Sequence, residues 1–261
     1  MKIAVVTGAS SGMGREFVLA IDKKYGTILD EIWVLARRKE RLEELQNKVK
    51  TKLRIFPINL LQQESYQKYT ESLKKYNPTV GILVNSSGFG KIGNFSEISR
   101  EDNLSMIELN CQALTKVIYD TLAFMKKGGR IINLASSAAF LPQPGFAVYA
   151  AGKSYVLSLS RALKYELMNR GISVTAVCPG PVKTEFFDIA EENSQIPLYK
   201  KLVMANPVKV VDKALSDAMA GKTKSVYGLS MQAFQVLCKI VPHELILKLL
   251  QFNPTSSKEM N

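Results

Sequence analysis

Short apolar runs rich in β-branched residues recur along the first two thirds of the chain, and longer amphipathic segments separate them. The runs cover residues 2–6, 32–36, 53–58, 81–85, 130–135 and 172–178. Runs of this length favour buried strands, and the helical periodicity between them favours helices. Strands that alternate with helices form a parallel sheet covered on both faces. We therefore predict a single doubly wound α/β domain over residues 1–261.

A different pattern ends the chain, because two short amphipathic helices are predicted at about residues 229–252, with Pro242 between them. One helix face carries Met231, Phe234, Leu237 and Val241, and the next carries Leu245, Leu249 and Phe252. We expect these faces to cover the core or a dimer partner. Peripheral contact with a membrane surface through Lys239 and Lys248 is the alternative. The expected assembly is a homodimer.

Composition narrows the class of partner. Hydrophobic residues make up 46% of the chain and charged residues 22%, which is ordinary for a globular protein. The formal net charge of +12 raises the question of a nucleic acid. The lysines and arginines are dispersed at helical surface spacings, however, so a solvated surface is favoured and no nucleic-acid partner is expected.

Cysteine use and the absence of targeting patterns indicate a cytoplasmic protein. Cys111, Cys178 and Cys238 form no CxxC pair and lie in apolar stretches, so we expect buried thiols in a reducing compartment. No signal peptide opens the chain, and no apolar run is long enough to span a bilayer. His243 is the only histidine and has no companion ligand, so no metal site is expected.

The first predicted strand leads into TGASSGMG at residues 7–14, followed by an apolar helix. Glycines at such a turn let the backbone approach a pyrophosphate at the positive end of the helix. A phosphate-binding P-loop is disfavoured, because no Lys-Ser or Lys-Thr follows the last glycine. The second strand is followed by Arg37 and Arg38 rather than by a carboxylate. Guanidinium groups can fork onto a ribose 2′-phosphate, which favours NADP(H) over NAD, unless these arginines only open a solvated helix.

Residues 133–153 place Ser136, Tyr149 and Lys153 at spacings that suit proton transfer to or from a carbonyl oxygen. In a helix, Tyr149 and Lys153 lie one turn apart on one face. The lysine ammonium is expected to lower the pKa of the tyrosine. Ser136 comes at a strand end, where its hydroxyl is free to bond a substrate oxygen.

Taken in order, these motifs resemble the short-chain dehydrogenase/reductase family over roughly residues 2–185. The matching motifs are TGASSGMG at 7–14, NSSG at 85–88, Asn110, Ser136, Tyr149 with Lys153, and PGPVKT at 179–184. The resemblance implies a Rossmann sheet and a catalytic set of four residues. Tyr149 would be the acid/base and Ser136 would orient the carbonyl. Lys153 would bind the ribose and perturb Tyr149, and Asn110 would hold a water of the proton relay.

The same motifs imply the cofactor contacts. The expected set is Gly8, Ser10, Ser11, Gly12, Met13, Gly14, Arg37, Arg38, Asn59, Leu60, Asn85, Gly88, Tyr149, Lys153, Pro179, Gly180, Val182 and Thr184. Val182 and Thr184 would meet the nicotinamide carboxamide. The chain departs from the family pattern at Ser86 and Ser87, where the family usually has NNAG, and at Asn59, where an Asp is common.

The resemblance places a substrate loop at about residues 181–206, before a helix that Asn206 and Pro207 begin. The substrate pocket is expected to include Phe140, Phe146, Phe186, Phe187 and Leu202. So apolar a lining favours a bulky substrate such as a hydroxysteroid or bile acid. The predicted function is an NADP(H)-dependent oxidoreductase that moves a hydride between the nicotinamide and a carbonyl or secondary alcohol. The alternatives are a reductase of 3-oxoacyl thioesters or of general ketones and aldehydes, and a catalytically silent cofactor-binding regulatory protein.

Overall fold

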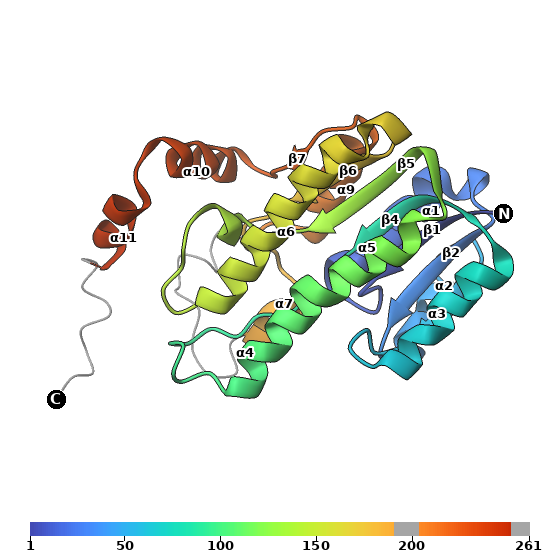
Figure 1. Ribbon diagram of the computed structural model, residues 1–261, viewed down its shortest axis with the longest axis horizontal. Helices are drawn as coiled ribbons and strands as arrows, with labels where there is room; N and C mark the ends of the chain where they lie inside the picture. Colours follow the sequence, from blue (N-terminus) through green and yellow to red (C-terminus); the bar gives the residue numbers. More distant parts are fainter. Residues whose placement is uncertain (191–203, 252–261) are drawn as a thin grey trace.

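The computed structural model describes residues 1–190 and 204–251, and its core is a seven-stranded parallel sheet with strand order β3-β2-β1-β4-β5-β6-β7 (Figure 1). The strands are β1 (Lys2–Thr7), β2 (Glu31–Ala36), β3 (Leu53–Pro57), β4 (Thr79–Asn85), β5 (Met125–Leu134), β6 (Ser173–Val177) and β7 (Lys224–Ser225). The predicted doubly wound α/β fold is confirmed. Six of the strands fall on the six predicted runs. β5 begins earlier than expected, and its pairing with β4 shifts register between Val80 and Ile82.

Helices cover both faces of this sheet. The helices of the described residues are α1 (Gly12–Tyr25), α2 (Lys39–Gln46), α3 (Gln63–Tyr76), α4 (Arg100–Ile107), α5 (Leu114–Leu122), α6 (Ala147–Glu166), α7 (Phe186–Ala190), α9 (Pro207–Met219), α10 (Leu229–Ile240) and α11 (His243–Gln251). Short helical turns are η1 (Gly26–Ile28), η2 (Glu108–Ala113), η3 (Ser137–Phe140) and η4 (Met168–Arg170).

Alternate side chains of each strand supply two separate apolar layers, because successive strand residues point to opposite faces. On one face α1, α2 and α9 pack against residues such as Ala4, Val6 and Val34. On the other face α3, α5 and α6 pack against Val5, Trp33 and neighbouring residues. The central strands are therefore buried on both sides, which explains their nearly continuous apolar sequences.

β7 is short and is held by a buried carboxylate on α9. Asp217 accepts hydrogen bonds from the Ser225 hydroxyl at 2.7 Å and from Lys213 at 2.8 Å and Lys222 at 2.7 Å. The helix itself begins as predicted, with the Asn206 side chain accepting a hydrogen bond from the Val208 amide at 2.9 Å and with Pro207 in the first turn.

The two predicted C-terminal helices are present as α10 and α11, which lie at one end of the domain (Figure 1). Their inner sides cover the core. Cys238 and Ile246 are buried, and Met231, Phe234 and Val241 pack against the same apolar cluster. Leu237 of α10 and Leu245 of α11 were expected on these inner faces but are 47% and 53% exposed. The side chain of Leu249, and Phe252, lie outside what the structure describes.

Two further expectations concern the chain as a whole. The thiols of Cys111, Cys178 and Cys238 are free and buried, as predicted. In the described ranges 1–190 and 204–251, the structure has no helix with the length and apolar character needed to cross a membrane.

Candidate active site

A cavity of about 1440 Å³ opens at the carboxyl ends of the parallel strands. The β1–α1 turn, the ends of β2, β4 and β5, the start of α6 and residues 179–187 line it. Pockets for a single small molecule are usually about 300 to 1,000 Å³, so this cavity has room for two ligands side by side. The ends of parallel strands are also where such sheets bind nucleotides.

The turn after β1 forms a close-packed cradle. A Cβ on Gly8, whose φ is +67°, would come within 2.9 Å of the Ser86 backbone, and one on Gly14 would come within 2.2 Å of the Gly8 carbonyl oxygen. No other residue type fits either position without moving the backbone. The Thr7 hydroxyl accepts hydrogen bonds from the amides of Ser86 at 3.1 Å and Ser87 at 3.2 Å. The ends of β1 and β4 are thus joined, and the N-terminus of α1 faces the cavity with a geometry that fits a pyrophosphate.

Arg38 lies beside this cradle in a network of hydrogen bonds. Its Nη2 donates to the Ser11 hydroxyl at 2.7 Å and to the Ser10 hydroxyl at 3.3 Å. Its Nη1 donates to the Glu185 carboxylate at 3.0 Å, and Arg41 bonds the other oxygen of that carboxylate. Partial burial favours the neutral acid, but the hydrogen bonds from Arg41 and Arg38 outweigh it and lower the pKa of Glu185. Arg41 and Glu185 were not among the predicted site residues.

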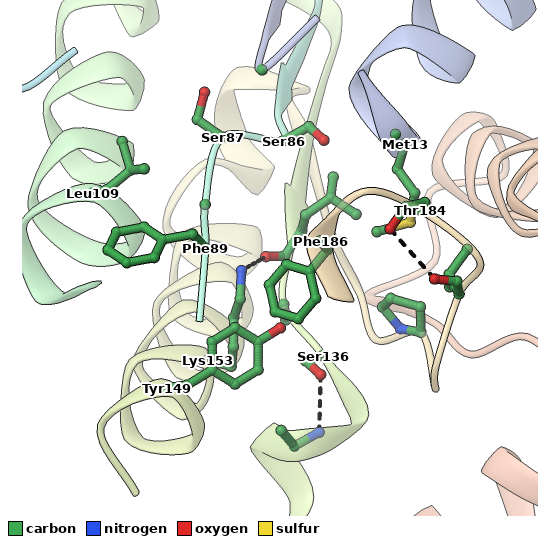
Figure 2. Close-up of a pocket in the computed structure, with 18 of the residues that line it drawn as sticks. Met13, Ser86, Ser87, Phe89, Leu109, Ser136, Tyr149, Lys153, Thr184 and Phe186 are labelled. Atoms are coloured by element: carbon green, nitrogen blue, oxygen red, sulfur yellow. Dashed lines mark hydrogen bonds between the residues drawn. The ribbon is translucent and has the colours of Figure 1, made fainter. Parts of the chain in front are cut away.

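The catalytic end of the cavity gathers Ser136, Tyr149 and Lys153 (Figure 2). Ser136 lies two residues beyond the end of β5, and its hydroxyl accepts a hydrogen bond from the Ala138 amide at 3.1 Å. Tyr149 lies in the first turn of α6, where its ring stacks on Phe146 with centroids 4.2 Å apart. The strand end and the helix start therefore present the serine and tyrosine hydroxyls to the same space.

Burial sets the protonation state of the tyrosine. Desolvation raises the pKa of Tyr149 to about 12, and the interaction with the Ser136 side chain opposes the shift only in part. The sequence-based expectation of a lowered pKa is therefore wrong for this geometry. The pattern of a tyrosine one turn before a lysine indicates proximity, but it does not reveal how deeply the phenol is buried. At neutral pH Tyr149 carries its proton.

Lys153 is buried one helical turn further along. Its Nζ donates a hydrogen bond to the Leu134 carbonyl oxygen at 2.8 Å and lies 5.5 Å from the centroid of the Tyr149 ring. Desolvation lowers its pKa to about 8, with the nearby Cys111 and Cys178 acting in the opposite direction. Lys153 lines the cavity, and Figure 2 shows its side chain next to Tyr149.

Asn110 lies in η2, a π-helical segment between α4 and α5, and it is almost fully buried. Its side-chain oxygen accepts a hydrogen bond from the Phe89 amide at 3.1 Å, and its side-chain nitrogen donates to the Phe89 carbonyl at 2.8 Å. A π-helical turn inside an α-helix often accompanies a functional site. Here it lets one amide side chain hold the backbone that follows β4.

The structure brings most of the predicted cofactor residues to the cavity wall, with two exceptions. Asn85 is buried and donates a hydrogen bond to Asn133 at 2.8 Å, so its side chain joins β4 to β5 rather than facing a ligand. Gly14 is the other exception, and the predicted catalytic residue Asn110 does not line the cavity either. The residues that line it are Gly8, Ser10, Ser11, Gly12, Met13, Arg37, Arg38, Asn59, Leu60, Gly88, Tyr149, Lys153, Pro179, Gly180, Val182 and Thr184.

The predicted substrate residues divide in a similar way. Phe146, Phe186 and Phe187 line the cavity, and the Phe186 ring lies 5.4 Å from that of Tyr149. Phe140 does not line it but packs against Phe234, with ring centroids 6.4 Å apart. Leu202 lies outside the described residues.

Leu141, expected beside the catalytic loop, lines the cavity, but several other apolar wall residues were missed, namely Phe89, Leu109, Met231, Phe234 and Leu247. Three of them come from α10 and α11. The amphipathic pattern of those helices was visible in the sequence, but nothing local to it indicates that its apolar face borders a cavity. No sequence pattern marked Phe89 or Leu109 as lining the cavity.

The glycine cradle and Tyr149 line one cavity, so a dinucleotide with its pyrophosphate on the cradle would extend toward Tyr149. The class of protein so defined is a dinucleotide-dependent dehydrogenase or reductase. A protein-family model described as short chain dehydrogenase matches residues 2–195, and the chain belongs to that family. It is therefore an oxidoreductase that acts on a carbonyl or alcohol group with a nicotinamide cofactor.

Comparisons with individual proteins agree with this assignment. The chain is 27% identical over 238 residues to a 3-oxoacyl-[acyl-carrier-protein] reductase of Aquifex aeolicus, covering 87% of this chain and 96% of the relative. The fold matches a short-chain dehydrogenase from Sphingobium yanoikuyae in complex with NADPH, with a TM-score of 0.78, 24% identity and 98% of each chain covered. It also matches the bulky-bulky ketone specific alcohol dehydrogenase from Comamonas testosteroni, with a TM-score of 0.72, 26% identity and coverages of 93% and 95%. Other matching structures hold NAD or NADH.

The buried ammonium predicts a particular dependence of stability on pH. The folded-state pKa of Lys153, about 8, lies below the ordinary value of 10.5. The charge therefore costs the folded protein stability at neutral pH, and that cost disappears as the pH rises from about 8 to about 10.5. Between about pH 7 and about pH 9.5 the wild type should gain about 2 kcal/mol of unfolding free energy relative to Lys153→Met. Denaturant titrations at both pH values measure this difference.

The same comparison with Lys126→Met is the control, because Lys126 is an exposed lysine at the other end of β5. A difference between wild type and Lys153→Met that does not change with pH would contradict the burial of a charged ammonium.

Proposed function

We propose that the protein transfers a hydride between NADP(H) and a bulky apolar ketone or the corresponding secondary alcohol. The observation that carries the proposal is the buried Tyr149, which shares one cavity with Ser136 and with a nucleotide cradle. A catalytically silent cofactor-binding protein would not need a phenol, a hydroxyl and an ammonium directed at one space. The nicotinamide supplies or accepts the hydride when it is bound.

In the reducing direction Tyr149 donates its proton to the developing alkoxide. A phenol with a pKa raised to about 12 holds this proton throughout the neutral range. The Ser136 hydroxyl orients the carbonyl oxygen toward the phenol. Lys153 binds the ribose hydroxyls, and its charge stabilises the phenolate that remains after proton transfer. Asn110 holds the Phe89 backbone and a water through which the proton is replaced.

Replacement of the proton donor tests the mechanism. Tyr149→Phe should lower kcat by about 10³-fold, because general-acid catalysis is lost, and should leave the NADPH dissociation constant nearly unchanged. Turnover is followed by NADPH oxidation, and binding by the fluorescence of the cofactor. Tyr165→Phe is the matched control, because that tyrosine lies on the same helix and is 69% exposed. A near-normal kcat in Tyr149→Phe would exclude this residue as the acid.

The preference for NADP(H) rests on Arg38. Its guanidinium lies on the cradle hydroxyls of Ser10 and Ser11, at the edge of the cavity where the adenosine ribose would sit. Arg37 also lines the cavity and is exposed. A planar guanidinium with several donors binds a phosphate in a fork, whereas the 2′-hydroxyl of NAD(H) offers it much less.

Cofactor kinetics test this preference. Arg38→Leu should lower kcat/KM for NADPH by roughly 10- to 100-fold, the usual range for a lost hydrogen bond to a charged group, and should change the value for NADH little. Lys39→Leu removes one positive charge from the next position and should affect NADPH far less. Equal kcat/KM for the two cofactors in the wild-type protein would refute the preference.

The apolar wall supports a bulky substrate, for which hydroxysteroids and bile acids are the leading candidates. Aromatic rings from Phe89, Phe146 and Phe186 face the cavity, and α10 and α11 add Met231, Phe234 and Leu247. Similarity to the bulky-ketone alcohol dehydrogenase supports the same class, whereas the acyl-carrier-protein reductase keeps a 3-oxoacyl thioester as the second candidate. Burying about 200 Å² of apolar substrate surface contributes up to roughly 5 kcal/mol before ordering costs.

A variant of α10 tests the substrate class. Phe234→Ala should lower kcat/KM for a steroid ketone by about tenfold through lost apolar contact, and should leave the value for acetone unchanged. Leu229→Ala is the control, since that side chain lies on the same helix and is 84% exposed. If the wild type reduced small polar ketones as well as steroid or long-chain ketones, the apolar pocket would not be the substrate site.

The assembly we propose is a homodimer formed on α5 and α6. Tyr119 is 80% exposed and Tyr155 is 43% exposed, and both border a shallow apolar hollow between these helices. Exposed aromatic patches of this kind are typical of protein interfaces. The inner faces of α10 and α11 are already used to cover the core of their own chain.

Light scattering tests the assembly. The wild type should be a dimer, and Tyr119→Glu should convert it to a monomer, because a carboxylate would be buried without a partner. Tyr165→Glu introduces the same charge at an exposed position of α6 and should leave the dimer intact. A wild-type monomer or tetramer would contradict the proposal. Liposome flotation of the wild type tests the alternative, in which the C-terminal helices contact a membrane surface.

A further inference from the structure

We propose that Glu185 is a specificity-determining residue whose carboxylate competes with the ribose 2′-phosphate for Arg38 and Arg41. This inference rests on the proposed preference for NADP(H). It adds that the Glu185 carboxylate, as well as the arginines, sets the preference. It also adds that the competition between this carboxylate and the 2′-phosphate is coupled to the aromatic residues beside Tyr149.

The contacts of Glu185 are those of a bound anion. One carboxylate oxygen accepts a hydrogen bond from Arg38 Nη1 at 3.0 Å, and the other oxygen bonds Arg41. The remaining donors of Arg38 are directed at Ser10 and Ser11 in the glycine cradle. Two guanidinium groups that converge on one carboxylate, next to a phosphate cradle, form a site in which a phosphate finds the same donors.

The ion pairs are accessible enough to be exchanged. The side chains of Arg38 and Arg41 are each 42% exposed and that of Glu185 is 41% exposed. Partly exposed ion pairs contribute little to stability, typically less than about 1 kcal/mol. A dianionic 2′-phosphate can therefore displace the carboxylate, and the carboxylate reduces the affinity for that phosphate only moderately.

Glu185 is joined directly to the residues that shape the catalytic end. Thr184 precedes it and packs close to Gly12 in the cradle, and Phe186 follows it with its ring 5.4 Å from Tyr149. The far end of α7 is held separately, because the Ala190 carbonyl accepts a hydrogen bond from the Ile92 amide at 3.1 Å. The carboxylate thus fastens one end of α7, so its displacement should loosen that end.

Binding of adenosine nucleotides without nicotinamide tests the competition. The probes are adenosine 2′,5′-bisphosphate and 5′-ADP, titrated calorimetrically into the full-length protein. Glu185→Gln should bind the 2′,5′-bisphosphate about fivefold more tightly than the wild type and should bind 5′-ADP equally, a change of about 1 kcal/mol. Glu185→Ala should show the same direction.

Glu43→Gln is the matched control. Glu43 lies on α2, is similarly exposed and pairs with Lys39, so this variant removes one negative charge nearby without touching the two arginines. If Glu185→Gln gained no more affinity than Glu43→Gln, or lost affinity, then Glu185 would not compete, and a loss would mean that it holds the arginines ready for the phosphate.

Hydrogen exchange tests the coupling. In the wild type the 2′,5′-bisphosphate should speed exchange of the amides at residues 186–190, and 5′-ADP should not. In Glu185→Gln that exchange should be fast without any ligand. Unchanged exchange at these amides in both experiments would overturn the coupling to α7.

The nucleotide titrations distinguish failure of the proposed NADP(H) preference from failure of the competition by Glu185. A wild type that binds both nucleotides equally, together with a Glu185→Gln variant that prefers the 2′,5′-bisphosphate, would refute the natural preference for NADP(H) and support the competition. A wild type with a clear preference that Glu185→Gln leaves unaltered would refute only the competition.

Discussion

Burial of the Lys153 ammonium is the constraint on which the geometry of the site depends. A charge without water needs a fixed partner, and here the partner is the Leu134 carbonyl at the end of β5. This bond fixes α6 against the strand end. Because Tyr149 lies one turn earlier on the same helix and Ser136 lies two residues beyond Leu134, the bond also sets where the two hydroxyls meet.

Desolvation acts on both ionisable groups of this pair and drives their pKa values apart, because it favours the neutral form of each. The phenol rises to about 12 and the ammonium falls to about 8. Under the proposed mechanism, the site then holds its transferable proton firmly, and its positive charge is lost first as the solution becomes alkaline. The buried thiols of Cys111 and Cys178 lie close enough to Lys153 to moderate its shift, which gives them an electrostatic influence without a chemical step of their own.

Local sequence patterns were sufficient to predict the strands, the glycine cradle and the catalytic motif, because each depends on neighbours within a few residues. The errors have a common origin in contacts between distant segments. Asn85 pairs with Asn133 because the register of β4 and β5 places the two opposite each other. Phe140 packs against Phe234 and does not line the cavity. Glu185 pairs with Arg41 on α2 and with Arg38, which directly precedes that helix. No periodicity or motif encodes such pairings, nor the depth of burial that sets the pKa of Tyr149.

One small feature has consequences for how this architecture can diversify. The backbone of Val182 pairs with Ala205, and the Lys183 amide and the Ala205 amide are both bonded across this junction. The two ends of the segment between Val182 and Ala205 are therefore held side by side. The entropic cost of closing a loop rises only by about 0.6 kcal/mol for each doubling of its length. Insertions that follow the contacts of Thr184, Glu185 and Phe186 can therefore lengthen this segment at little cost while the sheet, the cradle and the tyrosine keep their positions, so that its length can vary almost independently of folding stability.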